Sequence, residues 1–180
     1  MNSIKEARQR IHDAIAKQKF MLYVWAEEKL NLKEWRSLEV WDALKIYLFT
    51  KHSVSFSEFD SLGVDQLKMI LAGEMSSWTL PEHHRHISGN TSIEPKTAAQ
   101  VFLHSCLLDA KMNAAAEEFG DWVGKENAFG VNGRDALELL LCRERGFRPG
   151  EVSNWSMDTI RKVVGPEFNS WMERQGSRGL

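Results

Sequence analysis

The sequence is poor in cysteine, and this scarcity excludes two ways of stabilising a small protein. Its 180 residues contain only two cysteines, Cys106 and Cys142, which are far apart in the chain. A disulfide framework or a thiolate zinc site needs more cysteines, or a closely spaced pair. A chain of this length buries an apolar core without such cross-links. We therefore predict no metal and no cofactor.

The sequence also lacks long apolar runs and a strong charge of either sign. No stretch approaches the roughly 18 apolar residues that a membrane-spanning helix needs. The N-terminal sequence has neither the apolar segment nor the small-residue cleavage site of a secretory signal. The net charge is -2 at pH 7. We expect a cytoplasmic protein that does not bind membranes, although a local basic face for nucleic acid is compatible with this charge.

Motifs typical of enzymes are missing as well. There is no glycine-rich phosphate loop and no serine nucleophile elbow. Cys106 is two positions from His104, and side chains at that spacing on a helix point away from each other. Cys142 lies in an apolar run and is expected in the core. We predict no catalytic residue; an enzyme whose site is assembled from dispersed residues is the most distant alternative.

Helical periodicity is what the sequence does contain, and it covers most of the chain. Apolar residues recur at three- and four-residue steps over residues 3–28, which predicts a long helix. Ser55 or Ser57 is expected to cap a brief helix, and Gly63 or Asp65 to begin the next one, which Gly73 ends. Further helices are predicted over residues 37–51, 58–62, 65–71, 96–119 and 134–145. The fold class is therefore all-α.

Segments rich in glycine, proline and asparagine separate these helices. Residues 81–95 are predicted to connect two helical units, at 1–80 and 96–174, and residues 175–180 to form a frayed tail. The stretch 120–133 is expected to be irregular, because it contains four glycines and two asparagines among its polar residues.

The two units resemble each other in sequence. Residues 42–78 align with residues 135–171 without a gap, at a constant offset of 93 positions (135 − 42 = 93). Chance similarity seldom keeps register through two turn regions, so we predict an internal duplication of one helical unit. The first-copy residues that recur identically are Asp42, Ala43, Leu44, Leu48, Glu58, Asp65, Glu74, Ser77 and Trp78. The repeated aspartates are expected at helix N-termini, where they cap or complement the helix dipole.

Tryptophan is unusually frequent, with seven residues in the chain. Large aromatic side chains supply much of the apolar area that a core buries. Most of these tryptophans are therefore expected in the core. Tryptophan is also enriched at protein interfaces, so one or two of them are expected to contact a partner.

One segment resembles a helix-turn-helix element, which suggests an alternative function. Residues 57–69 combine a short helix, a turn at Gly63 and a following helix. Basic residues that could face a phosphate backbone or an acidic partner are Lys68, Arg143, Arg145, Arg148, Arg161 and Lys162. A recognition helix usually presents more hydrogen-bonding side chains than this one. A helical corner that only packs is therefore the favoured interpretation.

A histidine cluster in the connector is the remaining candidate for chemistry. His83, His84 and His86 follow Glu82, and closely spaced histidines can bind a transition metal. Because no further ligand accompanies them at a known spacing, we expect a solvated loop. The predicted function is a non-enzymatic regulatory or adaptor protein that acts through a protein interface, with a partner protein or with itself. The alternative is a DNA-associated transcriptional regulator.

Overall fold

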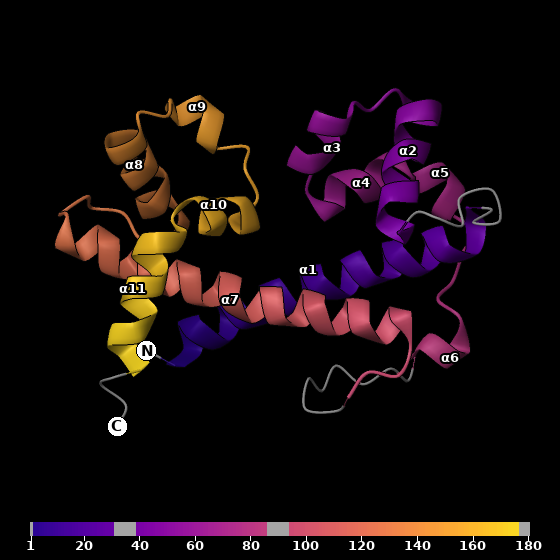
Figure 1. Cartoon of the computed structure of the whole chain (residues 1–180), viewed down its shortest axis with the longest axis horizontal. Coiled ribbons are helices and arrows are strands. Elements are labelled where there is room, and N and C mark those ends of the chain that lie inside the picture. The colour runs from indigo at the N-terminus through magenta and orange to yellow at the C-terminus, as the bar shows by residue number, and fades with distance from the viewer. Residues whose placement is uncertain (1, 31–38, 86–93, 177–180) are drawn as a thin grey trace. The chain divides into compact units, whose positions relative to one another are not determined.

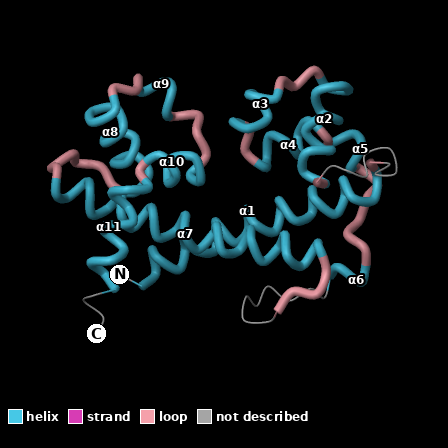
Figure 2. The backbone as a smooth tube through the Cα atoms, in the orientation of Figure 1, coloured by secondary structure: helices cyan, strands magenta, loops and turns pink. Residues whose placement is uncertain are grey.

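The computed structural model describes residues 2–30, 39–85 and 94–176, and every regular element in these ranges is a helix (Figure 1). Loops and turns are the only other described structure (Figure 2). The predicted all-α fold class is confirmed. None of these described helices is long and apolar enough to cross a lipid bilayer.

Two long helices, α1 (Asn2–Lys29) and α7 (Ala98–Glu126), each contribute to two compact units. Residues 13–110 form one unit, which we call the middle unit. Residues 1–12 and 111–180 form the other, the terminal unit. Each unit thus contains part of α1 and part of α7. The predicted boundaries at 1–80 and 96–174 concern the sequence repeat and stay a prediction.

The middle unit packs four short helices against its parts of α1 and α7. Its largest fully buried side chains include Trp25, Leu44 and Leu71. Tyr23 of α1 stacks on Phe102 of α7 with ring centroids 4.2 Å apart. The short helices are α2 (Val40–His52), α3 (Phe56–Ser61), α4 (Val64–Ile70) and α5 (Ala72–Met75), followed by the single turn α6 (Glu82–Arg85).

The turns of the middle unit follow from local capping. Ser55 is the N-cap of α3: its hydroxyl accepts from the Glu58 N–H at 3.2 Å, and the Glu58 carboxylate accepts from the Ser55 N–H. Such a capping box satisfies two N–H groups that the helix itself leaves unpaired. Gly63 is the N-cap residue of α4, and its N–H donates to the Gln66 side chain. The helix ends at Ile70, so Gly73, which lies inside α5, does not end it as predicted.

The terminal unit contains α8 (Gly133–Arg145), α9 (Pro149–Val152), α10 (Met157–Val163) and α11 (Gly165–Gly176). Phe119, Leu137 and Phe168 lie in its core. The Arg134 guanidinium donates to the backbone carbonyls of Ser153 and Trp155, at 3.0 and 2.7 Å. These bonds fasten the loop between α9 and α10 to the start of α8, because a guanidinium presents several donors in a fixed plane.

The expectation of an irregular stretch at 120–133 is wrong for its first half, because α7 runs on to Glu126. A Cβ on Gly120 would stand 2.0 Å from the Gly133 carbonyl oxygen, and one on Gly124 would stand 2.1 Å from that of Val131. The glycines therefore mark the place where a loop lies directly against the helix, not a break in it. Likewise α11 extends to Gly176, and the rest of the predicted frayed tail lies outside the described residues.

The repeated aspartates Asp42, Asp65, Asp135 and Asp158 all lie in the first turn of a helix. None of them is the N-cap residue itself. Their positions therefore agree with the predicted interaction with the helix dipole, but not with capping. The described tryptophans are buried or half-buried, as expected of core residues. Trp35 lies outside the described residues.

Candidate functional site

Five of the six basic residues predicted to contact a partner lie in the terminal unit, and four of these five form ion pairs with nearby carboxylates. Arg143 bonds Glu144 at 2.7 Å and the Asn127 side chain at 2.6 Å, and its guanidinium lies over the Phe129 ring at 4.9 Å. Arg145 pairs with Glu167 at 2.8 Å. These exposed ion pairs stabilise little but reduce the positive potential of the surface.

Two further basic residues share one carboxylate on α10. Asp158 accepts from Arg161 at 2.5 Å and from Lys162 at 2.6 Å. Burial raises the pKa of Asp158, but hydrogen bonds from Lys162 and Arg161 outweigh that effect and lower it below its ordinary value. Arg148 stands at the N-cap of α9, where its backbone N–H donates to Glu151. Carboxylates therefore compensate the charge of four predicted basic residues: Arg143, Arg145, Arg161 and Lys162.

The helix-turn-helix-like element of the middle unit is a packed corner. Phe59 of α3 and Val64 and Leu67 of α4 are buried, and Lys68 is half-buried. The exposed face of α4 carries Asp65, Gln66 and Met69. A recognition helix needs donors aimed at base edges or phosphates, and a carboxylate and a thioether are poor choices for either. Lys68 lies on this element in the middle unit, whereas the other predicted basic residues belong to the terminal unit.

The histidine cluster is only partly described. His83 and His84 lie on α6, and His86 lies outside the described residues. His84 is not fully solvated as expected: its ring packs edge-on against Phe20, with centroids 5.9 Å apart. Burial and the neighbouring His83 lower the pKa of His84. Among the described residues, no group of three histidine, cysteine, aspartate or glutamate side chains is arranged to hold a metal ion.

Cys106 is a core residue. It is buried in the middle unit, and burial raises the pKa of its thiol to about 11. A thiol protonated at neutral pH is a poor nucleophile.

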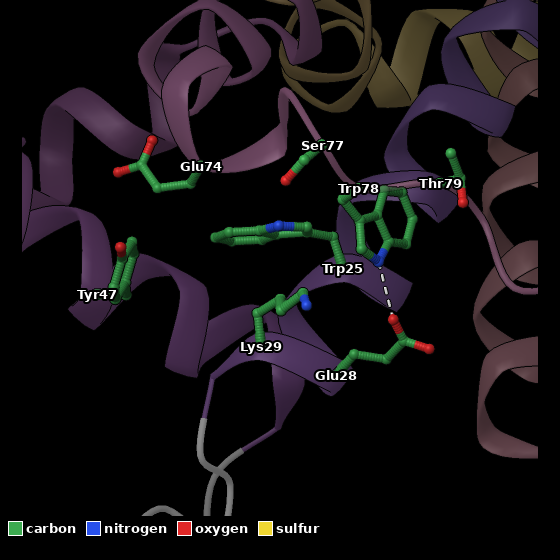
Figure 3. Close-up of a pocket in the computed structure, with 8 residues that line it drawn as sticks. All are labelled: Trp25, Glu28, Lys29, Tyr47, Glu74, Ser77, Trp78 and Thr79. Carbon is green, nitrogen blue, oxygen red and sulfur yellow. Dashed lines mark hydrogen bonds between the residues drawn. The ribbon is translucent and has the colours of Figure 1, made fainter.

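A concave site in the middle unit, which we call the aromatic cavity, is lined by three aromatic side chains. Its volume is about 540 Å³, within the range of small-molecule sites. Figure 3 shows the Trp25 ring between Tyr47 and Trp78, with two carboxylates and a lysine around them. The lining residues are Trp25, Glu28, Lys29, Tyr47, Glu74, Ser77, Trp78 and Thr79.

Three elements position these side chains. Trp25, at the C-terminal end of α1, is 2% exposed, so its ring is fixed by the core, and its centroid lies 6.1 Å from that of Tyr47 on α2. The Trp78 indole N–H donates to Glu28 at 2.8 Å (Figure 3). This bond fixes the segment after α5 to α1. The Trp25 indole nitrogen has no hydrogen-bond partner.

The second carboxylate of the cavity is held from the other side. Glu74 of α5 bonds the His52 ring nitrogen at 2.8 Å. Burial raises the pKa of Tyr47, and the charge of Glu74 and a hydrogen bond to it raise it further. Tyr47 therefore stays neutral at physiological pH and offers its ring and hydroxyl to the cavity.

None of the cavity residues was predicted as a site residue. The available signal was the surplus of tryptophan, since Trp25 and Trp78 both line the cavity. Periodicity alone places Trp25 in the core, and nothing in the sequence brings it to Trp78. Comparison with known proteins adds no assignment: no family model, no curated protein and no solved structure matches this chain.

Proposed function

We propose that this protein is a non-enzymatic regulatory or adaptor protein that acts through a protein interface. The observation that carries the proposal is an apolar stripe on the outer face of α7 in the middle unit. Val101 and Leu108 are exposed by 53% and 49% although both are large and apolar. They are seven residues apart and so lie on one helical face, on which Ala98 and the polar Ser105 complete the alternating three- and four-residue steps that coiled coils use.

The terminal unit has a stripe of the same kind on α1. Ile4 and Ile11 are exposed by 61% and 59%, and Ala7 stands between them on the same helical face. Exposed side chains in such register are costly in water, because burying apolar area is favourable by about 25 cal/mol per Å². A contact that covers them therefore gains free energy.

The partner that fits these stripes best is a second copy of this chain. A heptad seam packs its side chains between those of another seam with the same spacing, and each copy brings two. An isologous contact uses the same patch on both subunits, so each stripe contributes its buried apolar area from both copies. Regulation or scaffolding by the resulting dimer is the function proposed.

The double variant V101E/L108E tests this proposal. We expect the wild-type protein to be dimeric by light scattering coupled to size exclusion, and the variant to be monomeric, because buried glutamates oppose the contact. M69E is the matched control: Met69 is exposed by 70% but lies on α4, outside both stripes. A wild-type protein that is monomeric at high micromolar concentration contradicts self-association.

The DNA-binding alternative has less support. Arg145, Arg161 and Lys162 each have a carboxylate partner, which reduces the net charge offered to a phosphate backbone. Its test is retention on DNA at low salt, compared with that of the variant R161Q/K162Q. Salt-sensitive retention that the variant loses would favour this alternative.

The internal duplication of residues 42–78 and 135–171 remains part of the proposal. The paired helices have equal lengths: α2 and α8 have 13 residues each, and α4 and α10 have 7. The C-cap residues of α2 and α8 are Ser53 and Gly146, which occupy the same aligned position. Both have a positive φ, of 56° and 72°. An experimental structure in which α2–α5 superpose on α8–α11 at another offset than 93 contradicts the duplication.

Aligned positions are also buried alike. Leu44 and Leu137 are both 0% exposed. Leu71 and Val164, which follow α4 and α10, are exposed by 0% and 1%. Equal burial at a constant offset supports one ancestral packing arrangement, because unrelated helical corners would not keep core positions in register.

A further inference from the structure

The aromatic cavity of the middle unit brings aromatic rings and negative charge together in one place. Tyr47 and Trp78 are half-buried and offer ring surface to it, whereas Trp25 is 2% exposed and forms its wall. Trp25, Tyr47 and Trp78 line it from α1, α2 and the segment after α5 (Figure 3). The charged lining residues are Glu28, Glu74 and Lys29, which leaves one negative charge in excess. We infer that this cavity binds an organic cation with an alkylated ammonium group.

The rings account for the preference for an alkylated ammonium. The face of an indole or phenol ring carries negative charge, so the rings of Trp78 and Tyr47 attract a cation that is bound over them. An alkylated ammonium also presents methyl groups, which make apolar contact with the same rings. A strongly hydrated inorganic cation lacks the second contribution and prefers carboxylate oxygens alone.

The carboxylates are already oriented before a ligand arrives. Glu28 accepts from the Trp78 N–H at 2.8 Å, and Glu74 accepts from His52 at 2.8 Å. The hydrogen bonds therefore restrain the Glu28 carboxylate beside the Trp78 ring and the Glu74 carboxylate beside the His52 ring. A site that is ordered in advance loses less conformational entropy on binding.

Lys29 is the residue that opposes this preference. Figure 3 shows its ammonium group below the Trp25 ring and next to Glu28. Its positive charge at the edge of the cavity repels a cationic ligand. Removing it should raise the affinity for a cation, whereas a cavity meant for an anion would lose affinity.

Calorimetric titration of the whole protein with choline tests the inference. We expect measurable binding, and binding at least about tenfold weaker for dimethylbutanol, which replaces the charged nitrogen by carbon. Acetate is expected not to bind. Binding of dimethylbutanol as tight as that of choline, tighter binding of acetate, or no heat with choline at millimolar concentration overturns the inference.

Three variants separate a charge effect from a structural one. E74Q keeps the shape of the cavity and is expected to weaken choline binding about fivefold to tenfold. K29M is expected to strengthen it several-fold. E82Q, on the exposed turn α6, is the control that should change nothing. K29M is expected to gain affinity for choline and E74Q to lose it, so unfolding of a variant cannot produce both results. Equal choline affinities for the three variants contradict the inference.

Two sources of the ammonium group are distinguished by the choice of probe. Free cations are represented by choline. A side chain on another protein is represented by lysine blocked at both ends, with its side-chain nitrogen unmodified or trimethylated. Trimethylated lysine that binds more tightly than choline assigns the cavity to a protein ligand, and the reverse order assigns it to a free cation.

Discussion

The substitution G120A is expected to destabilise the terminal unit by about 3 kcal/mol. The new Cβ would stand 2.0 Å from the Gly133 carbonyl oxygen and 2.6 Å from its carbon. Both atoms belong to the backbone, so no flexible side chain gives way. Either α7, which carries the core residues Phe119 and Val123, or the start of α8 has to move. Urea unfolding followed by circular dichroism measures the change.

A glycine in the same unit supplies the control. Gly150 in α9 has no atom within 4 Å of an added Cβ, and its φ is not positive. G150A is therefore expected to change the unfolding free energy by no more than about 1 kcal/mol, and toward greater stability, because alanine restricts the unfolded chain. G120A and G150A with equal effects would show that the contact between α7 and the loop is not as close as the structure has it.

Gly120 and Gly124 illustrate a structural feature that the sequence alone does not reveal. Helix existence follows from apolar periodicity, a local property, and this is why the helices over 3–28 and 134–145 were predicted almost to their ends. The C-terminal end of α7 is not predicted correctly, because glycine disfavours a helix when only local propensity is considered. What keeps Gly120 and Gly124 helical is contact with residues 131–133, and contact between separate segments leaves no periodic signal.

The candidate sites also depend on contacts between segments that are far apart in the sequence. The basic residues are visible in the sequence as charges, but the carboxylates that pair with them cannot be identified from it. Arg145 and Glu167 are 22 positions apart, and only the packing of α8 and α11 joins them. The cavity was missed because Trp25 and Trp78 are 53 positions apart (78 − 25 = 53) and meet through Glu28. Abundant tryptophan indicated burial and interfaces without indicating which rings come together.

Replacing Asp121 is expected to have the second largest effect, because one carboxylate joins three segments of the terminal unit. It accepts from the Arg8 guanidinium at 2.6 and 2.9 Å, and from the Gly133 N–H at 2.8 Å. Bidentate pairs of this kind are among the stronger hydrogen bonds in proteins. The variant D121A loses all three bonds, whereas D121N keeps an acceptor for Gly133. We expect losses of about 2–3 and about 1–2 kcal/mol, after allowance for partial exposure.

The matched control is D135N in the first turn of α8. Asp135 is exposed, and its interaction with the helix dipole is worth at most about 1 kcal/mol. Arg8 also bonds Glu117 at 2.9 Å, so α1 keeps one link to α7 in either Asp121 variant. Urea unfolding of D121N and D135N at neutral pH measures both effects; equal losses would contradict the special position of Asp121.

The pH dependence of the same contact gives an independent test. The hydrogen bond from Arg8 lowers the pKa of Asp121 below its ordinary value; burial opposes this, and the charge of Arg8 and the Gly133 N–H add to it. A lowered folded-state pKa contributes stability that is complete above the unfolded value, near 3.9, and is lost as the pH falls through the folded value. The difference in unfolding free energy between wild type and D121N should therefore be constant from about pH 7 to pH 5 and shrink below about pH 4. A difference that grows on acidification would mean that the Asp121 carboxylate is destabilised by its surroundings, which the bonds from Arg8 and Gly133 argue against.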